Sequence, residues 1–149
     1  MMLSKPECGW TTFAMGETKC SLSYLTNVPM DWLNEAIHGL ETLRPFTVHG
    51  YLEPGRMLCT VSYWNCYLIF EDDGKSPLST DELSREIIPI SMLDFCKQLY
   101  DDILENIGQW RDWSVSYAEK NKNLQEKLDK LQKLIIAKEN CFNEGHCFI

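Results

Sequence analysis

The chain has 149 residues, a formal net charge of −8 and 44% hydrophobic residues. This length suits a single domain, 1–149, that buries its own core, and the hydrophobic content excludes an intrinsically disordered chain. The negative charge disfavours nucleic acid, whose phosphates it repels, and favours a basic protein partner.

The first predicted elements are a strand and a helix. From Thr18 to Tyr24, apolar residues occupy every second position, which is the pattern of a half-buried strand. Pro29 suits the first turn of a helix, and apolar residues then recur at helical spacing until Arg44 and Pro45 end the run.

An antiparallel meander is predicted next. Residues 46–52 and 57–63 alternate on either side of the turn sequence Glu53-Pro54-Gly55, and a further strand covers residues 66–71. Residues 85–90 are β-branched but contain Pro89, which cannot donate a ladder hydrogen bond. This segment is therefore expected at a sheet edge or leading directly into the next helix.

Ser91 is predicted to cap a helix that ends near Gly108. Its buried stripe is formed by apolar residues at helical spacing, namely Met92, Cys96, Leu99, Ile103 and Ile107. The opposite, exposed face is predicted to carry Asp94, Gln98, Asp101 and Glu105.

A second capping pattern, Ser116 with Glu119, predicts a long final helix that extends to Lys138. Its apolar residues Leu124, Leu128, Leu131 and Ile135 span too few heptads for a coiled-coil seam, so packing against the domain, and a monomer, are favoured over a dimer. The expected fold is α+β: an antiparallel sheet of four to five strands packed against an N-terminal helix and two C-terminal helices, with residues 140–149 as a flexible tail.

The chain contains no recognisable catalytic, metal or nucleotide motif, so no cofactor is expected. His49, Glu53 and Cys59 offer the minimum groups for acid–base or thiol chemistry around the hairpin. Cys141, His146 and Cys147 are zinc ligands by type, but their spacing differs from that of paired zinc hooks, so no metal site is expected.

The cellular setting follows from the cysteines and the N-terminus. Seven cysteines are scattered through apolar segments, which favours reduced thiols. The N-terminus does not have the pattern of a secretory signal, and no segment approaches the roughly 20 apolar residues of a membrane span. A cytoplasmic protein without a membrane partner is expected.

Acidic residues are concentrated between Glu71 and Asp112, where eleven acids and four bases give a local net charge of −7. Such a cluster favours encounter with a basic protein. The expected contact residues are the acids of this segment and two tryptophans beside them, namely Glu71, Asp72, Asp73, Asp94, Asp101, Asp102, Glu105, Trp110, Asp112 and Trp113.

The order of segments carries a family resemblance. It comprises the strand ending Leu22-Ser23-Tyr24-Leu25, a helix around Trp32-Leu33, the hairpin at residues 53–55, Leu93-Asp94-Phe95 opening a helix, and the final amphipathic helix. Between Cys20 and about Ile136 this layout resembles small bacterial immunity proteins of polymorphic toxin and contact-dependent inhibition systems. The resemblance implies a cytosolic, non-enzymatic inhibitor that binds and neutralises one cognate toxin domain, often a basic nuclease.

Two alternatives belong to other classes of protein. One is a small hydrolase or transferase that uses His49, Glu53 and Cys59. The other is a homo-oligomeric structural subunit assembled through the apolar residues of the last helix.

Overall fold

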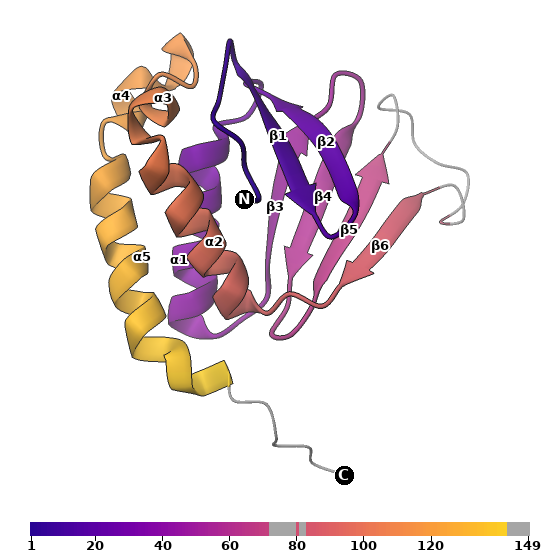
Figure 1. Ribbon diagram of the computed structural model, residues 1–149, viewed down its shortest axis with the longest axis vertical. Helices are drawn as coiled ribbons and strands as arrows, with labels where there is room; N and C mark the ends of the chain where they lie inside the picture. The colour runs from indigo at the N-terminus through magenta and orange to yellow at the C-terminus, as the bar shows by residue number, and fades with distance from the viewer. Residues whose placement is uncertain (72–79, 81–82, 143–149) are drawn as a thin grey trace.

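The computed structural model describes residues 1–71, 80 and 83–142 (Figure 1). The strands of this part are β1 (Trp10–Met15), β2 (Thr18–Ser23), β3 (Phe46–Tyr51), β4 (Arg56–Val61), β5 (Cys66–Glu71) and β6 (Ser84–Ile88). The α-helices are α1 (Val28–Thr42), α2 (Met92–Glu105), α3 (Ile107–Arg111), α4 (Ala118–Asn121) and α5 (Leu124–Lys138). Short 3-10 helices cover Val115–Tyr117 and Glu139–Phe142.

The predicted meander forms a four-stranded antiparallel sheet in the order β3-β4-β5-β6. The strands alternate as the sequence indicates, so that Met57, Cys59 and Val61 of β4 are buried. β6 ends just before Pro89 and lies at the sheet edge, as expected. The α+β class is thereby confirmed, with four strands in the main sheet.

The strand predicted from Thr18 is present but does not join this sheet. That strand, β2, pairs instead with β1, which was not predicted, in a separate two-stranded antiparallel sheet. A tight turn through Gly16, whose φ is +59°, joins the two strands. β1 and β2 pair with each other along their whole length, so local pairing places β2 outside the larger sheet.

The β1–β2 hairpin packs onto the sheet close to Gly50. A Cβ added there would lie 2.9 Å from Leu22 Cδ1, so the missing side chain of Gly50 makes room for β2. Aromatic rings continue the contact inward, since the Phe13 and Trp32 centroids lie 5.8 Å apart and those of Trp32 and Phe95 lie 6.3 Å apart. One hydrophobic core therefore joins the hairpin, α1, α2 and the sheet.

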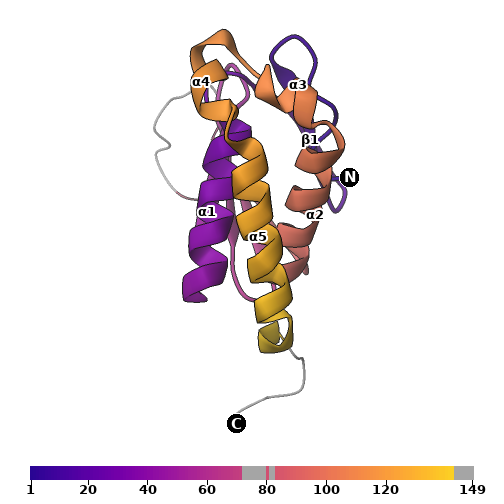
Figure 2. The same cartoon turned by 90° about the vertical axis from the view of Figure 1, so that its left-hand side faces the viewer.

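Helices α1, α2 and α5 form a helical layer on one side of the sheet, in which α5 packs onto both α1 and α2 on the side away from the sheet (Figures 1 and 2). Leu124, Leu128, Leu131 and Ile135 of α5 are buried in this layer. Packing against the domain is confirmed, and the oligomeric alternative loses the surface on which it relied.

The predicted long final helix is interrupted. Ser116 does not cap it; Ser116 N donates instead to Ser114 Oγ at 3.3 Å, and a 3-10 turn and α4 precede α5. Among the described helices, none combines the length and apolarity that a membrane span requires. Of the predicted tail, Phe142 packs against the core, and residues 143–149 lie outside the described part.

Candidate partner-binding surface

The exposed face of α2 carries three carboxylates, Asp94, Asp101 and Glu105, which we call the acidic stripe. α2 begins as predicted, with Asp94 N donating to Ser91 Oγ at 3.0 Å. Asp101 follows Asp94 by seven residues and Glu105 follows Asp101 by four, so the three lie on one helical face, and all three side chains are exposed. The only base of the helix, Lys97, lies 3.2 Å from Glu139 Oε1 and is thus already paired.

The acidic stripe has no ion pair within residues 1–71, 80 and 83–142. Asp112 is also exposed, at the end of α3. These four carboxylates are the part of the predicted set that the described structure leaves at the surface and without a basic partner.

Asp102 does not belong to this surface, and its prediction as a partner contact is wrong. The residue is 2% exposed. Its Oδ2 accepts hydrogen bonds from Met2 N at 2.8 Å and from Leu3 N at 2.9 Å, and its Oδ1 accepts one from Gln98 Nε2 at 2.9 Å. The carboxylate therefore anchors the N-terminal segment to α2.

Trp110 and Trp113 are buried as well, so they are not the exposed anchors predicted. Their ring centroids lie 5.3 Å apart, and Trp113 Nε1 donates to Thr26 O at 2.8 Å. The chain after α2 folds back over the end of the helical layer, where Asn121 Nδ2 donates to Trp110 O at 3.2 Å. The junction between the helices thus uses both rings as its own core.

The remaining predicted contacts are distributed differently. Glu71 is half-buried and its Oε1 lies 2.7 Å from Arg56 Nε, which neutralises it within the sheet. Asp72 and Asp73 lie outside the described residues. Thus α2, with Asp112 of the following turn, carries the part of the prediction that the described structure leaves open to a partner.

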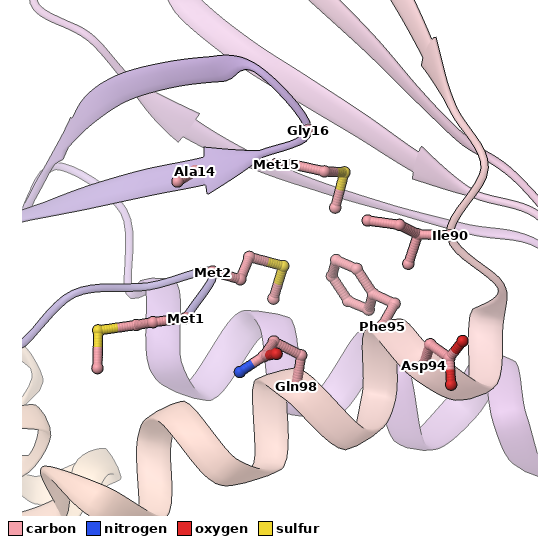
Figure 3. A pocket seen from close by; sticks show the side chains of 9 residues that line it. All are labelled: Met1, Met2, Ala14, Met15, Gly16, Ile90, Asp94, Phe95 and Gln98. Atoms are coloured by element: carbon pink, nitrogen blue, oxygen red, sulfur yellow. The ribbon is translucent and has the colours of Figure 1, made fainter.

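A cavity of about 340 Å³ opens at the start of α2, between that helix, the N-terminal segment and the end of β1 (Figure 3). Its apolar lining includes Met1, Met2, Met15, Ile90 and Phe95, whereas Asp94 and Gln98 contribute its polar side. Asp94 therefore belongs both to the acidic stripe and to the cavity. This site has no local sequence signal, because Met1 and Met2 reach α2 only through the path of the N-terminal segment.

The structure separates the groups of the proposed catalytic alternative. Val48 is the register partner of Cys59, so Cys59 faces the core with Val48, while His49 points to the other face of the sheet. A hydrogen bond with Cys66 and burial raise the pKa of the Cys59 thiol well above its ordinary value. A protonated, buried thiol is a poor nucleophile, so these residues do not form a thiol-based active site.

His49 instead lines a groove of about 350 Å³ between α1 and β3, together with Asp31 and Glu35. Burial raises the pKa of Asp31, and the nearby charge of His49 opposes that shift. Within the described ranges, His, Cys, Asp and Glu side chains do not gather in threes as metal ligands would. Of the C-terminal zinc-type residues, Cys141 is exposed, and His146 and Cys147 lie outside the described residues.

Comparison with known proteins gives no match among protein-family models, curated proteins or solved structures. The resemblance to immunity proteins therefore stays a prediction from the order of the segments.

Proposed function

We propose that this chain is a cytoplasmic, non-enzymatic immunity protein that binds and neutralises a cognate basic toxin domain, for which a nuclease is the favoured class. The observation that carries the proposal is the acidic stripe of α2. Asp94, Asp101 and Glu105 are exposed on one helical face, and none is paired within the described residues.

The mechanism rests on charge complementarity. A nuclease binds phosphates through lysines and arginines, and a row of carboxylates on a rigid helix competes for the same cations. Exposed charges of this kind act mainly on the association rate and on the choice of partner. The stripe would therefore guide the toxin into a complex in which its substrate-binding surface is covered.

The test uses the toxin candidate encoded beside the gene of this chain. The double variant Asp101→Lys/Glu105→Lys reverses two charges of the stripe, and both side chains are exposed. The matched control, Glu126→Lys/Asp129→Lys, makes the same change in net charge on the exposed face of α5.

The association rate is measured over a range of salt concentrations. We expect the α2 variant to associate at least about tenfold more slowly at low salt and with a weaker salt dependence, and the α5 variant to resemble the wild type. Equal effects of the two variants would assign the attraction to net charge alone. Unchanged binding by both would remove the acidic-stripe mechanism.

A further inference from the structure

We infer that the cavity at the start of α2 receives an arginine side chain of the basic partner. This inference rests on the proposed function and specifies how the partner is held. The cavity adjoins the acidic stripe through Asp94, so one partner surface can occupy both.

The apolar walls suit the methylene stem of a long side chain. Met2, Met15, Ile90 and Phe95 converge on the cavity in Figure 3. Met1, at the rim, is 63% exposed, whereas Met2 and Met15 are 4% and 3% exposed and must shift slightly to admit the stem. Methionine side chains adapt to an incoming group because they are unbranched and polarisable.

The polar side of the cavity offers hydrogen-bond acceptors. Gln98 Nε2 gives one of its two hydrogens to Asp102 Oδ1 at 2.9 Å, and the Gln98 carbonyl oxygen is an acceptor with no partner among the described residues. Asp94 contributes a carboxylate, which also only accepts. A ligand that fills this cavity therefore needs donors, and a positive charge to match Asp94.

The amides at the start of α2 do not turn the cavity into an anion site. Met92 N donates to Tyr63 O at 3.0 Å, Asp94 N to Ser91 Oγ at 3.0 Å, and Phe95 N to Ser91 O at 2.9 Å. These three donors are used within the protein, and an anion in the cavity would be repelled by the Asp94 carboxylate.

Arginine meets both requirements. Its stem packs along apolar side chains while its guanidinium stays polar, and that planar group presents five donors in a fixed fork. The fork can bond a carboxylate and a neighbouring carbonyl together, whereas the lysine ammonium is a compact and strongly hydrated charge.

The test uses the isolated protein and a small probe, Nα-acetyl-L-argininamide. Methionine methyl groups are labelled with carbon-13 and followed by NMR during the titration. We expect the signals of Met2 and Met15 to shift with a dissociation constant on the order of 1 mM, the affinity typical of so small a ligand. The neutral, near-isosteric citrulline amide should bind about tenfold more weakly.

Matched variants locate the charge. Asp94→Asn should weaken arginine-amide binding about tenfold, because it removes the carboxylate and keeps the side-chain shape. Asp101→Asn, seven residues further along the same face and outside the cavity, should bind like the wild type. Equal loss in both variants would point to general attraction and overturn the inference.

Two further results would overturn the inference: no shift of the Met2 and Met15 signals, or equally tight binding of citrulline or leucine amide, which would make the cavity a purely apolar site. Neither result bears on the toxin experiment, which measures the charges of Asp101 and Glu105 in a protein–protein association. The cavity and the acidic stripe can therefore fail separately.

Discussion

Replacing Asp102 by alanine should detach the N-terminal segment from α2. The buried carboxylate accepts two backbone hydrogen bonds, from Met2 N and Leu3 N, and a third from Gln98 Nε2. Leu3 is 0% exposed, so its amide lies inside the protein. Two backbone donors would remain buried without an acceptor.

The size of the effect follows from these contacts. Leaving a buried donor unpaired costs about 1–3 kcal/mol, and removing the acceptor from two amides therefore lowers the free energy of unfolding by about 2–6 kcal/mol. This is a large part of the roughly 5–15 kcal/mol expected for a whole domain. Asp102→Asn keeps one acceptor oxygen and should lose about half as much.

Urea unfolding followed by tryptophan fluorescence measures the free energy, and amide hydrogen exchange at Met2 and Leu3 reports the detachment. The control is Asp101→Ala, whose exposed side chain should change the free energy of unfolding by no more than about 0.5 kcal/mol. A loss below about 1 kcal/mol for Asp102→Ala, with exchange at Leu3 unchanged, would refute the anchoring role.

Gly39→Ala should lower the free energy of unfolding by about 1–3 kcal/mol, because the added Cβ would lie 2.2 Å from Phe46 Cδ1. At Gly108 an added Cβ would have no neighbouring atom within 4 Å, so Gly108→Ala should raise the free energy of unfolding by up to about 1 kcal/mol in the same urea assay. An equal effect of both changes would contradict the packing of α1 on β3. At pH 8, iodoacetamide should modify exposed Cys8 far faster than Cys20. Burial raises the pKa of Cys20 to about 11, which leaves on the order of 0.1% of this thiol as reactive thiolate. Mass spectrometry compares the two rates, and equal rates would refute the burial of Cys20. Since the pKa of Cys20 lies above its ordinary value of 9.0, its contribution to stability is complete below pH 9 and is lost as pH rises to about 11, which urea unfolding across that range would detect.

The main sheet was predictable because alternation is a local signal. β5 has the predicted bounds, and the β3–β4 hairpin follows the turn at Glu53-Pro54-Gly55. β1 was missed because Thr11 is a polar residue at a buried position. Its Oγ1 donates to Ser4 O at 2.7 Å, and this partner becomes visible only when the path of the N-terminal segment is known.

The acidic surface was predictable only in part, for a related reason. Helical spacing alone places Asp94, Asp101 and Glu105 opposite the buried stripe. The same spacing puts Asp102 three residues after Leu99 and next to Ile103, at the border of the buried apolar stripe. The burial of Asp102 was therefore indicated by the sequence itself. Its partners could not be found this way, because Met2 lies 100 residues away.

The dimensions of the acidic stripe limit what it can recognise. Asp94 and Asp101 are two helical turns apart, about 10 Å along the axis, and Asp101 and Glu105 are one turn apart, about 6 Å. At physiological ionic strength, charges are screened beyond roughly 8 Å. A cation that meets Asp94 is therefore largely screened from Asp101, whereas a cation near Asp101 and Glu105 can interact with both, so the positions of the partner's cations matter as well as their net charge. Under the proposed function, the stripe would favour a partner whose cations match this arrangement, and a basic protein with differently placed cations should bind more weakly even at equal net charge.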